Sequence, residues 1–311
     1  MQRFVLRWFY ISISTALLTA GTAFTGKTEQ APFVIRDNVN LVLLDVSVRK
    51  PEGGYVTGLS RNNFTVEDNG VKQQMTQFAA VDAPATVGLI VDNSGSMLRK
   101  RQEVVMSGLE FARSSNRNDE FFVVNFNDAV YFGLPGGVDF TDRLQTLQKA
   151  LHFGSPVGQT ALYDAIATGL RHLERGHYDT RTLIVVSDGG DNVSQIDFSE
   201  LKRLIEASRA TIYTIGLLDP DDRDLNPKVL RKISSLSGGG FFAPDKLDDL
   251  PAIFEKIAQD LRNRYSIAFI PRNTLNKPNH KPAVHTLKVV ARNNQGKKLI
   301  VHSRTAYIAA Q

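Results

Sequence analysis

The chain has 311 residues, of which 42% are hydrophobic and 22% charged, and its formal net charge is +5 at pH 7. This composition is that of a globular protein with one large or two modest domains, and the mild, scattered positive charge does not indicate nucleic-acid binding. The absence of cysteine excludes disulfides, thiolate metal ligands and a lipid-modified cysteine.

The first residues have the pattern of an export signal. Arg3 and Arg7 precede an apolar run that begins at Trp8 and closes with small residues from Ala20 onwards. This pattern predicts a signal peptide over residues 1–23 and a secreted or periplasmic mature chain. An uncleaved signal anchor is the alternative, but the run is short for a membrane span and contains Ser and Thr. No membrane span is predicted in the mature chain.

Two segments, residues 33–82 and 264–309, have the pattern of β-structure. In the first, for example, Ser47 is predicted to face away from Val46 and Val48. Each segment alone is too small for a stable core. We therefore expect both to pack together as one small β-sandwich, with the intervening domain inserted between them.

Residues 85–263 alternate strands and helices, which predicts an α/β domain with a doubly wound, mostly parallel sheet. The apolar runs at 87–91 and 183–186 are typical of strands buried on both faces. A helix is predicted from 97 to 114. The last helix, 247–263, has a single apolar stripe that favours packing on one side.

A polar cluster follows the first of these strands. Asp92, Ser94 and Ser96 stand at alternate positions and bring three hard oxygens close together. Such oxygens suit Mg²⁺, Mn²⁺ or Ca²⁺ and not zinc or copper. Two further oxygen-bearing residues follow along the chain. Thr160 opens a later predicted helix, and Asp188 ends another predicted buried strand.

Three other interpretations of this cluster are a Ser/Gly turn that caps the next helix, a serine-protease loop and an aspartyl-phosphate phosphatase. A serine nucleophile needs a histidine base, yet no histidine precedes His152 and the spacing is not Gly-x-Ser-x-Gly. A phosphatase needs a second acid where Ser94 stands. The matching Thr160 and Asp188 favour a metal site over a simple turn.

Taken together, Asp92-x-Ser94-x-Ser96, the distant Thr160 and the strand-end Asp188 resemble the metal-ion-dependent adhesion site of the von Willebrand factor type A domain. The flanking β segments resemble those of bacterial secreted proteins that carry this domain. The resemblance implies that Ser94, Ser96 and Thr160 bind a divalent cation, above all Mg²⁺, through their hydroxyls. Asp92 and Asp188 would act directly or through water, and an acidic residue of a protein partner would complete the shell.

Several residues near the motif have two interpretations. Arg99, Lys100 and Arg101 would attract an acidic partner, or they are solvated charges at the start of a helix. Asp191 and Asn192 are either outer-shell groups or helix caps. The acidic run at 219–224 is either a second Ca²⁺ site or a solvated loop.

Nothing in the sequence supplies a base or a nucleophile beside the proposed metal, so we expect binding without catalysis. The alternatives are a structural or assembly factor whose metal stabilises the fold and, less favoured, a metal-dependent hydrolase. In adhesion relatives the helix that corresponds to the last helix of the domain can shift on ligand binding, which here is an analogy only.

Overall fold

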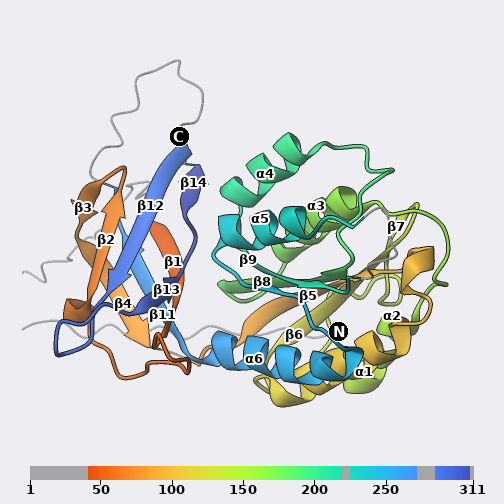
Figure 1. Ribbon diagram of the computed structural model, residues 1–311, viewed down its shortest axis with the longest axis horizontal. Coiled ribbons are helices and arrows are strands. Elements are labelled where there is room, and N and C mark those ends of the chain that lie inside the picture. Colours follow the sequence, from red (N-terminus) through yellow and green to blue (C-terminus); the bar gives the residue numbers. More distant parts are fainter. Residues whose placement is uncertain (1–40, 81, 219–224, 272–283, 309–311) are drawn as a thin grey trace, which may run out of the picture. The chain divides into compact units, whose positions relative to one another are not determined.

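The computed structural model in Figure 1 describes residues 41–80, 82–218, 225–271 and 284–308. The predicted signal peptide (1–23) and the acidic run (219–224) lie outside these residues. Within them, every helix is too short or too polar to span a membrane.

A six-stranded sheet with the order β10-β9-β8-β5-β6-β7 forms the centre of the α/β domain. Its strands are β5 (Ala85–Asp92), β6 (Glu120–Phe126), β7 (Val130–Phe132), β8 (Thr180–Ser187), β9 (Thr211–Gly216) and β10 (Phe241–Phe242). All neighbours are parallel except β6 and β7, which form a hairpin. This sheet confirms the predicted α/β fold class.

Helices cover both faces of this sheet, with α1, α2 and α6 on one face and α3, α4 and α5 on the other (Figure 1). Their bounds are α1 (Arg101–Ser114), α2 (Leu144–His152), α3 (Leu162–Leu173), α4 (Phe198–Ala207), α5 (Pro227–Ser237) and α6 (Leu250–Arg262). The short 3-10 helices η1 (Arg61–Asn63), η2 (Gly95–Met97) and η3 (Leu247–Asp249) complete the helical elements. The first helix of the domain therefore starts later than predicted, after η2.

The central strand β5 is where the winding of the sheet reverses. All eight of its residues are buried, and it pairs with β6 on one side and β8 on the other. The chain first passes from β5 to β6 and later returns to the other side of β5 as β8. At such a switch point the loops after the two central strands flank a crevice at the carboxyl edge of the sheet, so the loops after β5 and β8 lie where a ligand is expected.

Gly88, in the middle of β5, has no room for a side chain. A Cβ atom there would overlap the ring of Phe122 and lie within 2.6 Å of Leu183 Cδ2. We expect Gly88→Ala to lower the free energy of unfolding by about 1–3 kcal/mol through overpacking, as measured by urea titration. Gly136→Ala is the control, because no atom lies within 4 Å of its Cβ position, and should stay within about 0.5 kcal/mol. Equal effects would contradict this packing.

Residues from both ends of the described chain form two four-stranded sheets, β13-β1-β11-β4 and β14-β12-β2-β3. The strands of the first are β1 (Val42–Arg49), β4 (Met75–Ala80), β11 (Arg264–Phe269) and β13 (Ile300–His302). Those of the second are β2 (Phe64–Asp68), β3 (Val71–Gln73), β12 (Val284–Ala291) and β14 (Ala306–Ile308). One apolar core, which includes Leu44, Phe64, Ile267 and Leu287, joins both sheets. The predicted sandwich from the two terminal segments is therefore confirmed.

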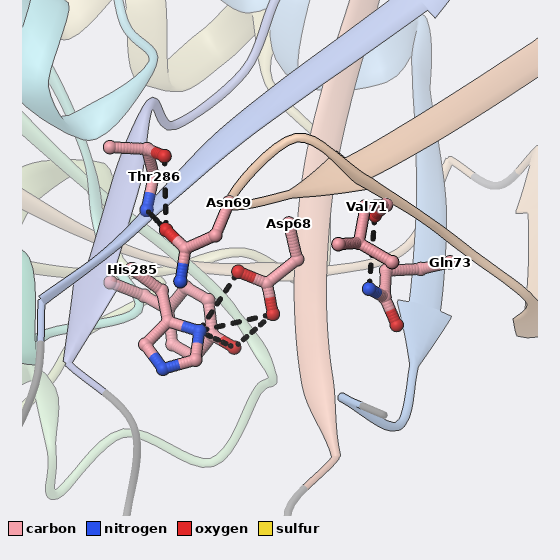
Figure 2. A network of polar contacts seen from close by, with 7 residues as sticks. Asp68, Asn69, Val71, Gln73, His285 and Thr286 are labelled. Atoms are coloured by element: carbon pink, nitrogen blue, oxygen red, sulfur yellow. Dashed lines mark hydrogen bonds and ion pairs between the residues drawn. The ribbon is translucent and has the colours of Figure 1, made fainter. Parts of the chain in front are cut away.

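A buried polar network fastens the β2–β3 turn to β12 and β14 (Figure 2). His285 Nδ1 lies 2.8 Å from Asp68 Oδ1, and the Tyr307 hydroxyl donates to Asp68 Oδ2 at 3.0 Å. Next to them, the side-chain oxygen of Asn69 accepts a hydrogen bond from the Thr286 backbone at 2.9 Å. The bonded residues are more than two hundred positions apart, so the network joins the two halves of the sandwich.

A second buried cluster connects α6 with β1, β9 and β11. Arg264 lies 3.6 Å from Asp45 and donates to the Tyr213 hydroxyl at 2.7 Å. Tyr213 in turn donates to Asp260, which also pairs with Arg49 at 3.2 Å. Burial would raise the pKa of Asp260, but the charge of Arg264 and the hydrogen bond from Tyr213 hold it below its usual value. This carboxylate is therefore charged and paired in the folded protein.

Asp119 holds the start of β5 and should make stability depend on pH. Its carboxylate accepts hydrogen bonds from the backbone of Ala85 at 2.7 Å and of Asn116 at 3.1 Å, yet burial raises its pKa to about 6. An unfolded aspartate titrates near 3.9. The folded state therefore binds this proton more tightly, and the contribution of Asp119 to the free energy of unfolding falls as the pH rises from about 4 to about 6.

Asp119 should lower the free energy of unfolding by at most roughly 1.4 kcal/mol for each unit by which the pH rises. Urea titrations between pH 4 and pH 7 in EDTA, on the wild type and on Asp119→Asn, measure this contribution as a difference in slope. The slope should be shallower in the variant. The same slope in both proteins would mean that the folded pKa of Asp119 is not raised.

Candidate metal centre

Two loops pack directly against each other at the carboxyl edge of β5. Gly95, in η2, donates its backbone N–H to Gly158 O at 3.2 Å, and Val157 donates to Asn93 O at 2.9 Å. Both bonds are between backbone atoms, and they connect the loop after β5 with the loop before α3. The chain segments that carry Ser94, Ser96 and Thr160 are thereby neighbours.

Hydrogen bonds connect four of the five predicted metal ligands: three of them through their side-chain oxygens, and Asp92 through the backbone N–H of Ser94. Ser94 Oγ lies 3.1 Å from Ser96 Oγ, and Ser96 Oγ donates to Asp188 Oδ2 at 2.5 Å. Asp92 Oδ1 accepts from the Ser94 backbone at 2.8 Å, and its Oδ2 accepts from Ser187 Oγ at 2.7 Å. Ser187, the last residue of β8, was not predicted from the sequence, because a serine before a strand-end acid is not a distinctive signal.

Thr160, the fifth predicted ligand, follows Gly158 in the loop that packs against the loop after β5. Its side chain makes no hydrogen bond to the other four among the described residues, but it is buried and its backbone is fixed. Thr160 N donates to Asn192 Oδ1 at 2.9 Å, and Asn192 N donates to Thr160 O at 3.0 Å. Asn192 follows β8 closely, so this pair of bonds holds the Thr160 loop beside the loop that carries Asp188.

The two carboxylates of the site are buried together. Asp92 is 1% exposed and Asp188 is 2% exposed. Burial, and then the charge of Asp188, raise the pKa of Asp92 to about 6, although hydrogen bonds from Ser94 and Ser187 oppose the rise. Among the described residues, no Lys, Arg or His makes an ion pair with either carboxylate. Two buried acids without a counter-ion are costly.

This donor set fits a hard divalent cation. The described residues contain no group of three or more His, Cys, Asp and Glu side chains that could hold a metal. Two carboxylates with the hydroxyls of Ser94 and Ser96 beside them are all-oxygen donors, which suit Mg²⁺ or Ca²⁺ and not the softer metals. A cation among them would also supply the positive charge that no Lys, Arg or His of the described residues brings to these carboxylates through an ion pair.

The three basic residues after the motif have different surroundings. Lys100 Nζ donates to Leu217 O at 2.8 Å, and Arg101 donates to Leu151 O at 3.0 Å and to Phe153 O at 3.1 Å. Lys100 thus holds the segment after β9, and Arg101 holds the C-terminal end of α2. Of the three, Arg99 is exposed and is the one whose side chain is available to a partner.

Asp191 follows β8 in the chain, and its side chain contacts the first turn of α3. Its Oδ1 accepts hydrogen bonds from Tyr163 N at 3.1 Å and from Ser194 Oγ at 2.5 Å. Burial raises its pKa. Of the two sequence interpretations, these contacts favour the helix cap, while Asn192 is the residue that supports Thr160.

The buried His285–Asp68 pair is an arrangement that chemistry could also use, and no sequence pattern predicted it. A histidine oriented by a carboxylate serves as a base in hydrolases when its other nitrogen faces a nucleophile. Here all hydrogen bonds among the described residues are made by Nδ1 of His285 and none by Nε2 (Figure 2). These contacts of Nδ1 join β2, β12 and β14 within the sandwich.

Residues 87–190 match the family model of the von Willebrand factor type A domain, a span that contains all five predicted ligands. Among solved structures, a von Willebrand factor type A protein from Catenulispora acidiphila is similar at 14% identity, covering 81% of this chain and 76% of that one with a TM-score of 0.52. Proximal thread matrix protein 1 from the mussel byssus is similar at 16% identity, covering 63% of this chain and 51% of that one with a TM-score of 0.50. At such identities these neighbours show the fold alone. No curated protein matches the chain.

Proposed function

We propose that the chain, whose residues 87–190 match the family model of the von Willebrand factor type A domain, is an exported interaction module that binds a protein partner through a divalent cation. The observation that carries the proposal is the pair of buried carboxylates, Asp92 and Asp188, which lie beside serine hydroxyls and have no counter-ion among the described residues. Export is inferred from residues 1–23.

In this proposal five side chains hold the ion, with Mg²⁺ preferred to Mn²⁺ or Ca²⁺. Ser94, Ser96 and Thr160 contribute hydroxyl oxygens, and Asp92 and Asp188 contribute carboxylates directly or through water. The ion would supply positive charge and an exchangeable coordination position. An acidic side chain of the partner would fill that position, and the contact needs no bond to be made or broken.

Two other functions compete with partner binding. A structural factor would use the ion only to neutralise the two acids, and no ligand would reach the ion. A hydrolase would need a base beside it, but no His or Lys among the described residues makes a hydrogen bond to Asp92, Ser94, Ser96 or Asp188. In partner binding an external carboxylate reaches the ion and leaves unaltered. In the structural role no external group reaches the ion, and in a hydrolase the bound molecule is cleaved.

Water proton relaxation of the Mn²⁺-loaded protein distinguishes them. Waters on a bound Mn²⁺ enhance relaxation, and N-acetyl-aspartic acid amide should lower the enhancement by displacing one of them. The neutral N-acetyl-asparagine amide is the matched control and should have no effect. A Mn²⁺ signal that no carboxylate changes would favour the structural role, and hydrolysis of the amide would favour the enzyme.

A further inference from the structure

Three of the four most exposed large apolar side chains among the described residues lie in the loops of the candidate metal centre. Leu98 is 64% exposed, Val157 56% and Phe153 54%, and the fourth is Met106 of α1. Leu98 follows η2, Phe153 follows α2 and Val157 lies before α3. We name Leu98, Phe153 and Val157 the apolar rim.

The backbone that carries the rim is fixed to the metal loop. Val157 N donates to Asn93 O at 2.9 Å, and Asn93 Nδ2 donates to Phe153 O at 3.3 Å. Arg101 donates to Phe153 O at 3.1 Å, and the ring of Tyr131 packs edge-on against that of Phe153 at 5.8 Å. The rim is therefore held in place while its side chains face solvent.

Single exposed apolar residues are ordinary, but a group of them at a candidate ligand site marks an interaction surface. We propose that the apolar rim is the docking surface for a partner segment that presents apolar side chains beside the carboxylate that reaches the ion. This inference rests on the proposed function and adds the chemistry of the partner: an acidic residue with apolar neighbours.

The small number of exposed basic side chains and the burial of the two carboxylates favour a protein segment over a lipid surface. Anionic membranes attract clusters of basic side chains, but Lys100 and Arg101 are bound to backbone carbonyls and leave Arg99 as the one exposed cation of the three. Asp92 and Asp188 are almost fully buried, so a single narrow side chain suits the approach to them. An acidic side chain also complements both Arg99 and the ion.

A random dodecapeptide library displayed on phage tests the partner chemistry. The full mature chain is immobilised in Mg²⁺, and bound phage are eluted with EDTA. We expect the recovered peptides to carry Asp or Glu within two residues of a large apolar side chain. As synthetic peptides they should bind at least about tenfold more weakly to a Leu98→Ser/Phe153→Ser/Val157→Ser variant. A matched Val284→Ser/Ile300→Ser variant, altered at two exposed apolar residues of the sandwich, should bind them like the wild type.

The other outcomes separate this inference from the proposed function. Acidic peptides that bind the rim variant as well as the wild type would overturn the inference and leave the cation-dependent function intact. Peptides that bind equally in EDTA or to Asp188→Ala, or no EDTA-eluted peptides at all, would overturn both. If vesicles of phosphatidylglycerol and phosphatidylcholine sediment the wild type but not the rim variant, the surface is a membrane contact, which also contradicts the inference. Equal thermal unfolding of all three proteins verifies that the substitutions leave the fold intact.

Discussion

Replacing Arg264 by methionine is expected to lower the free energy of unfolding by about 3–5 kcal/mol. Arg264 is 6% exposed, and its guanidinium faces Asp45 at 3.6 Å and the hydroxyl of Tyr213 at 2.7 Å. Burial alone would lower the pKa of Arg264, but Tyr213, Asp45 and Asp260 together raise it. Without the guanidinium, Asp45 loses its ion pair. Asp260 then has Arg49 as its remaining cationic partner.

Urea titration of wild type and variant measures this loss. Arg113→Met is the matched control, because Arg113 pairs with Glu110 at 3.2 Å on the exposed side of α1, and exposed pairs contribute at most about 1 kcal/mol. Adding Asp45→Asn to Arg264→Met should recover part of the loss, because Arg264 is the one residue with which Asp45 makes an ion pair among the described residues. If Arg264→Met lowered the free energy of unfolding as little as Arg113→Met, the cluster would not hold α6 to the sandwich strands.

Asp188→Asn is expected to have effects of opposite sign with and without metal. Asp188 is buried beside Asp92, and its charge contributes to the raised pKa of that residue. Asparagine keeps the shape and can still accept the Gly190 backbone bond at 3.1 Å and bond to Ser96. In EDTA the variant should therefore be more stable than wild type, by on the order of 1 kcal/mol, because two like charges no longer share the interior.

With metal the order reverses. A cation at one hundred times its dissociation constant adds roughly 2.7 kcal/mol to a protein that binds it only when folded. Wild type should gain this increment in Mg²⁺ while Asp188→Asn should not. Thermal unfolding of both proteins in EDTA and in Mg²⁺ gives the four values. A variant that is less stable in EDTA and gains as much from Mg²⁺ would contradict a charge-balancing role for the ion.

The elements that follow from local pattern were predictable. The apolar run of β5 ends at Asp92, the last residue of that strand, and the run of β8 ends one residue before Asp188. The reversal of the winding at β5, which pairs with β6 on one side and β8 on the other, brings the two strand ends together. The sandwich followed from size, since neither terminal segment can form a core alone. These conclusions depend on the periodicity of apolar residues and on segment length, and both can be read from the sequence.

Contacts between distant residues could not be predicted in this way. His285 and Asp68 are 217 positions apart, and no spacing rule relates them. Lys100 and Arg101 have the sequence pattern of solvated charges, but they donate to the carbonyl groups of Leu217 and Leu151, which only the fold brings close to them. The support of Thr160 by Asn192 likewise depends on how two loops meet at the sheet edge.

Isothermal titration of Mg²⁺ into the EDTA-treated and desalted full mature chain tests most directly whether these loops hold a cation. The wild type should bind one ion per chain. Ser94→Ala/Ser96→Ala, which removes two hydroxyl donors and leaves both carboxylates, should bind it at least about tenfold more weakly. No binding heat in the wild type with either Mg²⁺ or Mn²⁺, or the same affinity in the variant, would contradict a metal centre at Asp92, Ser94, Ser96, Thr160 and Asp188.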